Sequence, residues 1–147
     1  MDPLSEFVED AGLYFEGLGL SRTAGRIMGW LLVVEPDGDA PQFCEALGVA
    51  KSSVSVALRR LEQAGLVQKF RVSGMRRDRF RLAEDVFGRA FRTQMAALNE
   101  FVALADRGLS IIGDDPARRS RLENMREMYA FMSARFPQLL DEWEASR

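Results

Sequence analysis

Nine lysine and arginine residues gather between Lys51 and Arg81, and they are the side chains with the clearest chemical use in this chain. Only two acids, Glu62 and Asp78, share the stretch, so it carries a net charge of +7. The whole 147-residue chain has a net charge of −2, which leaves −9 for the other residues. A basic cluster on an otherwise acidic chain is typical of a surface that neutralises phosphate groups. The alternative is a solvated segment whose arginines bind no particular ligand.

The spacing of residues within this cluster indicates how it would meet DNA. Residues 51–64 have helical periodicity, with an apolar stripe of Val54, Leu58 and Leu61 and with Ala57 beside it. The opposite face is short, polar and basic, as expected of a helix that lies in a major groove. We expect four residues to read bases: Ser52, Ser53, Val56 and Arg59. We expect five to contact the DNA backbone: Lys51, Arg60, Arg76, Arg77 and Arg79.

Most of the residue types that enzymes need are missing. The chain has no histidine and one cysteine, which excludes histidine-based triads, histidine metal sites, thiolate zinc sites and an intramolecular disulfide. No glycine-rich phosphate-binding motif occurs. We therefore expect no enzymatic activity, no cofactor and no metal, and we interpret Cys44 as a small core residue. The acidic N-terminus is unlike a signal peptide, and no apolar run approaches the roughly 18 residues of a membrane span, so we expect a cytoplasmic protein.

A helix-turn-helix is predicted to position the base-reading residues. Residues 40–47 should form a short helix with Phe43, Ala46 and Leu47 turned inward. Pro41 suits the first turn of that helix, and Gly48 suits its C-terminal turn, where a positive φ is often needed. The helix over residues 51–64 follows as the recognition helix.

A β-hairpin is predicted directly after the recognition helix, which Gly65 ends. Residues 66–72 should form one strand, residues 73–75 a turn and residues 77–82 the returning strand. Such a hairpin after a recognition helix is a wing. We expect Arg76 or Arg77 to project from its tip, and Asp78 to hold one of the two in place.

Two helices are predicted before the motif. Residues 4–17 should form the first, and Ser21 should cap a second over residues 22–34. The second helix should bury residues at helical spacing: Ala24, Ile27, Met28 and Leu31. Residues 35–39 have the composition of a turn.

Three segments together resemble the MarR superfamily of bacterial transcriptional regulators: Gly25–Leu31 (GRIMGWL), Leu47–Ser55 (LGVAKSSVS) and Leu58–Val67 (LRRLEQAGLV). The helix that contains GRI at 25–27 and the wing sequence GMRR at 74–77 are closest to the GbsR-like branch. The similarity covers about residues 5–105 and is most specific over 47–82. It implies a homodimer that controls operons from a pseudo-palindromic operator in double-stranded DNA. We expect a repressor, and some relatives lose DNA affinity on binding a small effector.

Ala50 departs from the pattern of this family, which usually has a serine that caps the recognition helix at this position. Without that cap we expect the helix to start later, with Ser52 as its N-cap. Ser52 would then be less free to read bases.

Two apolar helices are predicted after the wing. One should cover residues 83–107 and end at Gly108, and the other should open with Asp114-Asp115-Pro116 and be kinked or interrupted at Pro137. Their apolar stripes exceed what one protomer can cover, so we expect a dimer interface. Its predicted residues are Phe87, Phe91, Leu98, Phe101, Leu122, Met125, Tyr129, Met132, Phe136, Leu140 and Trp143. The alternative is a helical pair packed only on its own winged domain.

An effector pocket is a further hypothesis. Five aromatic residues could line it: Tyr14, Phe15, Trp30, Phe91 and Tyr129. Aromatic boxes bind quaternary ammonium ligands, although aromatics at helical spacing more often belong to a core.

The chain is therefore predicted to be mainly α-helical with a small β-hairpin wing. Residues 1–20 should form an N-terminal packing and dimerisation helix, residues 21–83 a winged helix-turn-helix and residues 84–147 the dimerisation helices. The favoured function is sequence-specific DNA binding in transcriptional regulation. The alternative is a winged-helix module that contacts another protein and not DNA.

Overall fold

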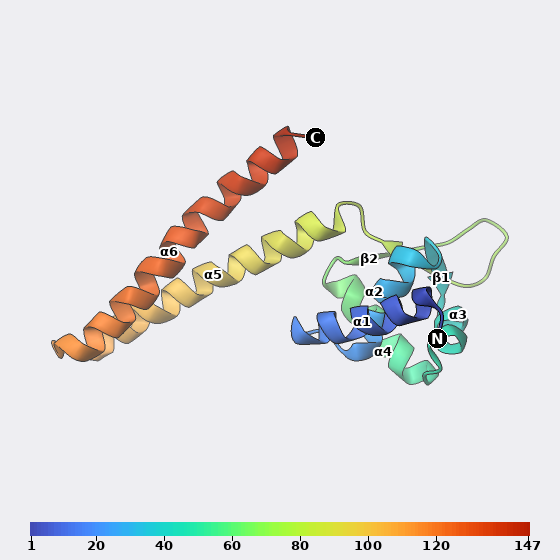
Figure 1. Ribbon diagram of the computed structural model, residues 1–147, viewed down its shortest axis with the longest axis horizontal. Coiled ribbons are helices and arrows are strands. Elements are labelled where there is room, and N and C mark those ends of the chain that lie inside the picture. The colour runs from blue at the N-terminus through green and yellow to red at the C-terminus, as the bar shows by residue number, and fades with distance from the viewer. The chain divides into compact units, whose positions relative to one another are not determined.

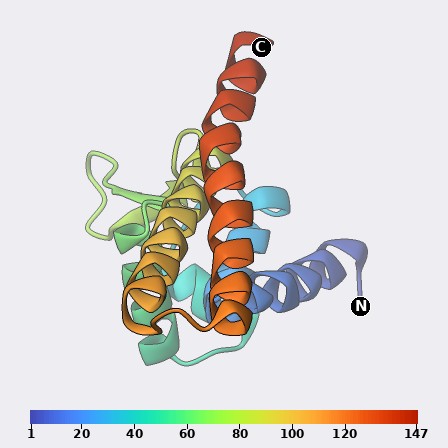
Figure 2. The same ribbon diagram turned by 90° about the vertical axis from the view of Figure 1, so that its left-hand side faces the viewer.

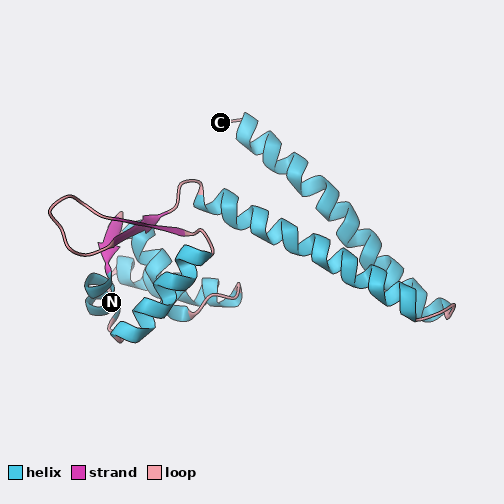
Figure 3. Ribbon diagram, turned by 180° about the vertical axis from the view of Figure 1, so that it is seen from behind, coloured by secondary structure: helices cyan, strands magenta, loops and turns pink.

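The computed structural model describes residues 1–147 and is mostly helical with one small antiparallel sheet, as predicted (Figures 1 and 3). The chain divides into two compact units, Met1–Val86 and Phe87–Arg147. The first unit contains α1 (Pro3–Gly17), α2 (Arg22–Val33), β1 (Asp37–Asp39), α3 (Ala40–Leu47), α4 (Lys51–Gln63), β2 (Val67–Phe70) and β3 (Arg79–Leu82). Helices α5 (Val86–Ile111) and α6 (Pro116–Ala145) account for the second unit. None of the helices is long and apolar enough to cross a membrane.

Side-chain caps fix where the first three helices begin. The Asp2 carboxylate accepts hydrogen bonds from the backbone N–H groups of Leu4 and Ser5 at the start of α1. Ser21 Oγ accepts from the Ala24 N–H at 3.1 Å, which confirms the predicted cap of α2. Asp39 forms a capping box with Gln42 at the start of α3. Each cap satisfies backbone donors that have no partner within the helix.

The sheet has the strand order β1-β3-β2, with both pairs antiparallel. The prediction that residues 35–39 form only a turn was wrong, because Asp37–Asp39 pair with Arg79–Arg81 of β3. A Cβ added to Gly38 would lie 2.9 Å from Trp30 Cζ3, so this residue type allows β1 to lie close against the core. Turn-forming residues thus make a strand where tertiary pairing overrides their local preference.

The wing has shorter strands than predicted. Strand β2 ends at Phe70 and β3 begins at Arg79, so residues 71–78 form a loop where the sequence predicted only a three-residue turn. Figure 3 shows this loop between the two strands. Gly74 in it has a φ of 85°, a left-handed conformation that glycine adopts without strain.

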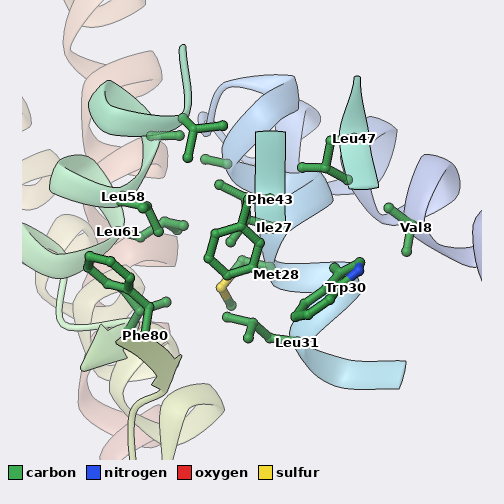
Figure 4. Packing of buried hydrophobic residues seen from close by; sticks show 14 of the residues in the cluster. Val8, Ile27, Met28, Trp30, Leu31, Phe43, Leu47, Leu58, Leu61 and Phe80 are labelled. Atoms are coloured by element: carbon green, nitrogen blue, oxygen red, sulfur yellow. The ribbon is translucent and has the colours of Figure 1, made fainter. Parts of the chain in front are cut away.

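The core of the first unit lies where α2, α3, α4 and the sheet meet (Figure 4). Its most buried large side chains are Ile27, Met28, Phe43, Val54 and Leu61. The predicted buried stripes of α2 and α4 are buried, and so is Trp30, whereas Leu32, which we expected to widen the buried face of α2, is exposed. Ala46 was predicted to face inward and is exposed, whereas Cys44 packs against the core. Residues Phe43 and Leu47, four apart in α3, define its inward face, and Ala46 lies off it.

Glycines let α1 and α2 approach closely. A Cβ added to Gly25 would lie 3.0 Å from Gly12 Cα, and one added to Gly29 would lie 2.6 Å from Ala11 Cβ. Backbone and Cβ atoms cannot yield as the end of a flexible side chain can, so these positions require glycine. Helix α1 therefore belongs to the same compact unit as the helix-turn-helix.

Helices α5 and α6 run antiparallel from the turn that joins them (Figure 2), and they diverge toward the C-terminus of α6 (Figures 1 and 3). Helix α5 begins at Val86 and not at residue 83, because Asp85 has a φ of 53° and lies outside helical geometry. Gly108 does not end α5, which continues to Ile111; a Cβ there would lie 3.0 Å from Leu122 Cδ1, so the glycine serves packing on α6.

The start of α6 is as predicted, and its proline is tolerated. Asp115 caps the helix by accepting from the Ala117 N–H at 3.1 Å. Pro137 lies inside α6, which is not interrupted there. A helix on the protein surface accommodates a proline more readily than a buried one, because water can bond to the freed carbonyl.

Candidate nucleic-acid interface

Helix α4 separates a buried stripe from an exposed polar face. Val54, Ala57, Leu58 and Leu61 are buried. The four residues predicted to read bases, Ser52, Ser53, Val56 and Arg59, are all exposed. The side chain of Val56 is apolar and yet 59% exposed, which leaves it available for contact with an apolar group such as a thymine methyl.

The recognition helix begins without a side-chain cap. Helix α4 starts at Lys51, with Ala50 as its N-cap residue and no side-chain hydrogen bond to the first turn. The expectation that the helix starts later with Ser52 as its cap was therefore wrong. Ser52 lies in the first turn and is exposed, and its hydroxyl does not cap the helix.

The turn before α4 has the predicted geometry. Gly48 adopts a left-handed conformation with φ 65° and ψ 36°, and its N–H donates to the Cys44 carbonyl at 2.9 Å. An L-residue with a side chain would be strained there.

A groove of about 530 Å³ lies between the start of α3, the helix α4 and the wing. Apolar residues of the core side, including Leu58 and Phe80, form part of its lining. Its basic lining residues are Lys51, Arg59, Lys69, Arg71, Arg76 and Arg77, and its acidic ones are Glu62 and Asp78. The excess of cations gives the groove the sign of charge that a phosphate backbone requires.

Ion pairs and one ring contact engage four of the nine basic residues of this region, Lys69, Arg71, Arg79 and Arg81, and leave five free. Lys69 lies 4.0 Å from Glu62, Arg71 pairs with Asp78 at 2.8 Å, and Arg81 lies 4.4 Å above the Phe70 ring. Five exposed cations form neither an ion pair within 4.0 Å nor a contact with an aromatic ring: Lys51, Arg59, Arg60, Arg76 and Arg77. This second group can bind phosphates without first giving up a carboxylate or a ring contact within the protein.

Arg79 lies in a different setting from the other predicted backbone contacts. It is in β3, its side chain is 16% exposed, and it donates two hydrogen bonds to the Asp37 carboxylate of β1. The second carboxylate, that of Asp39, lies 3.8 Å away. Because two acids neutralise this guanidinium inside the sheet, we leave Arg79 out of the proposed DNA surface.

Asp78 holds Arg71 and neither of the arginines beside it in sequence. Arg71 Nε donates to Asp78 Oδ1 across the wing loop. This hydrogen bond, together with the charge of Arg71, lowers the pKa of the Asp78 carboxyl below its ordinary value of 3.8. The pair closes the loop and leaves Arg76 and Arg77 free.

Of the predicted dimerisation residues, most are partly buried, four of them in ring contacts between α5 and α6, and two are exposed. Two ring pairs join α5 to α6, Phe91 with Phe136 at 5.6 Å between centroids and Phe101 with Tyr129 at 4.1 Å. The four residues of these ring pairs are partly buried. So are five others of the predicted set: Leu98, Leu122, Met125, Met132 and Leu140. Phe87 and Trp143 are more than half exposed.

A further set of large apolar side chains on α5 and α6 is exposed and was missed by the sequence prediction. It consists of Leu104, Ile111, Met128, Phe131 and Leu139. Helical spacing alone does not separate the seam between α5 and α6 from this outer row, because both rows repeat at steps of three and four.

The aromatic residues of the hypothetical effector pocket each have a neighbouring ring in their own unit. Trp30 is buried against Phe43, Tyr14 lies edge-on to Phe15 at 5.5 Å, and Phe91 and Tyr129 form the ring pairs already described. A shared cavity lined by all five stays a prediction.

Arg26 of α2 makes contacts that the sequence analysis did not predict. Its side chain is only 17% exposed, and it bonds to both α1 and the end of α3. The one signal in the sequence is an arginine between the small and apolar residues of the GRIMG segment.

Comparison with known proteins identifies relatives of both units. A model described as the MarR family matches residues 18–77, and a model described as an MmpR5-like MarR family transcriptional regulator matches residues 85–146. Over 131 residues the chain is 40% identical to the HTH-type transcriptional regulator MmpR5 of Mycobacterium tuberculosis, covering 88% of this chain and 79% of that protein. A crystal structure of a transcriptional regulator matches with a TM-score of 0.82 and 36% identity, over 98% of this chain and 99% of that one.

Proposed function

This chain belongs to the MarR family of transcriptional regulators, and we propose that it recognises a pseudo-palindromic operator in double-stranded DNA as a homodimer. The observation that carries the proposal is the polar face of α4, which is exposed and flanked by cations that no protein carboxylate neutralises. A face committed to folding would be covered or ion-paired.

The base-reading roles follow from side-chain chemistry and position on α4. Ser52 and Ser53 lie in the first turn, where a recognition helix comes nearest to base edges, and a hydroxyl can donate or accept there. Val56 offers an apolar contact to a thymine methyl. Arg59, farther along the same face, suits the O6 and N7 acceptors of guanine.

The remaining free cations are assigned to phosphates. Lys51 and Arg60 flank the reading face of α4, and Arg76 and Arg77 lie on the wing loop. A wing arginine could bridge phosphates or enter a narrow minor groove, where the negative potential is strongest. These contacts position the protein on DNA and add affinity for any sequence.

The homodimer is supported by the apolar surface of the second unit. Helix α6 has no fully buried residue, although its sequence is rich in large apolar side chains. Covering such a surface by a second copy would remove it from water. In a twofold dimer the recognition helices would contact half-sites about 34–36 Å apart, which is one turn of DNA.

We also propose repression, because a dimer seated on an operator excludes other proteins from the same DNA. A small effector that releases the dimer is part of this proposal, with the five predicted aromatics as its candidate contacts.

The GbsR-like branch stays a prediction, since the model that matches the second unit is the MmpR5-like one.

The proposal is tested by fluorescence anisotropy with the DNA upstream of the protein's own gene and a shuffled duplex of equal length. We expect the upstream DNA to bind at least about 10³-fold more tightly than the shuffled DNA at physiological salt. Equal, weak binding to both duplexes would contradict sequence-specific recognition, and would favour a winged-helix module that contacts another protein.

A further inference from the structure

The side chain of Arg26 connects three helices of the first unit. From α2, its Nε donates to Glu9 Oε1 of α1 at 2.9 Å, and a terminal nitrogen of the guanidinium also lies 2.7 Å from that oxygen. The same terminal nitrogen donates to the Leu47 carbonyl at 2.9 Å. Leu47 is the last residue of α3, so this bond reaches the turn of the helix-turn-helix.

Gly12 creates the path that this side chain follows. A Cβ at Gly12 would lie 2.6 Å from Arg26 Cγ, so any larger residue would displace the arginine stem. The stem therefore crosses α1 where that helix has no side chain, and the guanidinium is held between α1 and α3. Its planar fork suits such a site, because its donors can engage two acceptors at fixed angles.

The bond to Leu47 adds a side-chain contact to a turn that is otherwise closed by backbone hydrogen bonds from Gly48 and Val49 to the Cys44 carbonyl. The last carbonyls of a helix have no partner within the helix, and the Leu47 carbonyl finds one in Arg26. Three residues later α4 begins at an N-cap, Ala50, that makes no side-chain hydrogen bond. The base-reading end of α4 is thus not secured by its own cap.

We propose that Arg26 is a positioning residue for operator recognition, which fixes the turn at residues 47–50 and hence the start of α4, with Glu9 as its anchor on α1. This inference rests on the proposed function. Arg26 is mostly buried, and its Nε and one terminal nitrogen are engaged by Glu9 and Leu47, so we assign it no phosphate contact. Its replacement should weaken specific binding and leave non-specific binding unchanged.

The test compares Arg26→Lys with Arg22→Lys in the full chain. Arg22 is in the same helix and pairs with Glu16 at 3.2 Å, but both side chains are about half exposed and Arg22 makes no bond to α3. A lysine at position 26 keeps the charge but not the fork. We expect Arg26→Lys to weaken operator binding about tenfold, the loss expected for one hydrogen bond, without changing affinity for shuffled DNA or the salt slope. Arg22→Lys should match the unsubstituted protein.

A second substitution separates positioning from a general loss of stability. Ala50 has the extended backbone of an N-cap residue, with φ −67° and ψ 151°, so Ala50→Ser should cap α4 directly. Added to Arg26→Lys, it should restore at least about threefold of the operator affinity, because the cap secures the same end of the helix. No restoration, or an equal loss for operator and shuffled DNA, would overturn the positioning role.

Amide hydrogen exchange tests the role of Arg26 in the protein without DNA, so its outcome does not depend on the proposed function. The Val54 N–H makes the first helical bond of α4, to the Ala50 carbonyl at 3.2 Å. Its exchange should be about tenfold faster in Arg26→Lys than in Arg22→Lys, because a looser turn exposes this bond more often. If no DNA proves specific, the proposed function fails while this comparison still decides the role of Arg26. Equal exchange in the two variants would overturn it.

Discussion

At the scale of single residues, the number of positive charges matters less than which of them are free. Nine basic residues lie between Lys51 and Arg81, but ion pairs and the sheet engage several of them, Arg79 most completely. The five with neither an ion pair nor a ring contact are those on α4 and on the wing loop. Net charge therefore predicts where the DNA surface lies, and the positions of the carboxylates decide which cations we assign to it.

Replacing a residue that reads bases should change which DNA sequences the protein prefers, and should not lower its affinity for all sequences equally. Replacing Ser53 or Val56 by alanine should alter which operator variants bind, at about 1–3 kcal/mol for each base that the side chain no longer reads. The measurement is the affinity for a panel of operators that differ by single base pairs. A uniform loss across the panel would show that these side chains do not read bases.

The wing ion pair predicts a particular titration of Asp78. Its pKa is lowered in the folded protein by the Arg71 hydrogen bond, so its contribution to stability is fully present above the unfolded value of 3.8 and is lost as pH falls through the lower folded value. An NMR titration should place the Asp78 midpoint below 3.8, and Arg71→Ala should move it up toward 3.8. An unchanged midpoint in Arg71→Ala would contradict this pairing.

At the scale of elements, periodicity and capping residues located most helices correctly. Ser21 and Asp115 cap helices at the predicted positions, and the apolar stripe of α4 is buried as its spacing indicated. The errors at β1 and at the end of α5 share one physical cause. Residues 37–39 and Gly108 have turn-forming or helix-ending chemistry locally, but contacts with β3 and with Leu122 decide their structure.

Because α1 and α2 lie in close contact, we expect alanine to destabilise the protein at Gly29, which lies in that contact, and not at Gly17, which lies outside it. In Gly29→Ala the new Cβ would lie 2.6 Å from Ala11 Cβ and 3.3 Å from Val8 Cα, so the helices must separate. We expect a loss of about 1–3 kcal/mol in the free energy of unfolding, measured by urea denaturation.

Gly17→Ala is the matched control for that substitution. Gly17 is the last residue of α1 and a Cβ there would meet nothing within 4 Å. Alanine should be neutral or stabilise the protein by up to about 1 kcal/mol, because it restricts the unfolded chain and favours helix. Similar effects of both substitutions would contradict the packing described for Gly29.

At the scale of the whole molecule, the proposed dimer depends on the second unit. The sequence predicted apolar stripes there, yet it could not tell which apolar residues join α5 to α6 and which remain exposed. That distinction depends on how each helix is rotated about its axis against the other. The outer row that includes Met128 and Phe131 is now the better candidate for contact with a second copy.

A charge on this outer row should dissociate the dimer without unfolding the protomer. Phe131 is 54% exposed, so Phe131→Glu places its carboxylate in water in the monomer but buries it in the proposed interface. We expect dimer dissociation to become at least about 100-fold easier, since burying a carboxylate costs several kcal/mol even with Arg135, now 4.8 Å from the Phe131 ring, as its neighbour. Gln94→Glu, at an exposed polar position of α5, is the control.

Analytical ultracentrifugation measures this change directly. The unsubstituted protein and the control should sediment at twice the 16.6 kDa of one chain, and Phe131→Glu should sediment at the mass of one chain. An unsubstituted protein that is monomeric at micromolar concentration would contradict the dimer itself.

The central claim is that the winged helix-turn-helix is the DNA-binding surface, and the salt dependence of DNA binding tests it most directly. Arg76 on the wing loop and Arg121 on α6 are both exposed and form no ion pair within 4.0 Å, so they make a matched pair. Arg119 is unsuitable as a control because it donates to the Leu109 and Gly113 carbonyls at the turn between α5 and α6.

The measurement is the slope of log affinity against log salt for Arg76→Ala and Arg121→Ala. We predict that Arg76→Ala weakens binding to operator and shuffled DNA alike and reduces the slope by about 0.9 for each phosphate that is no longer neutralised, or about 1.8 for a dimer. Arg121→Ala should leave the slope unchanged. A reduced slope for Arg121→Ala with an unchanged one for Arg76→Ala would contradict the account, because the phosphates would then lie on the terminal helix and not on the wing.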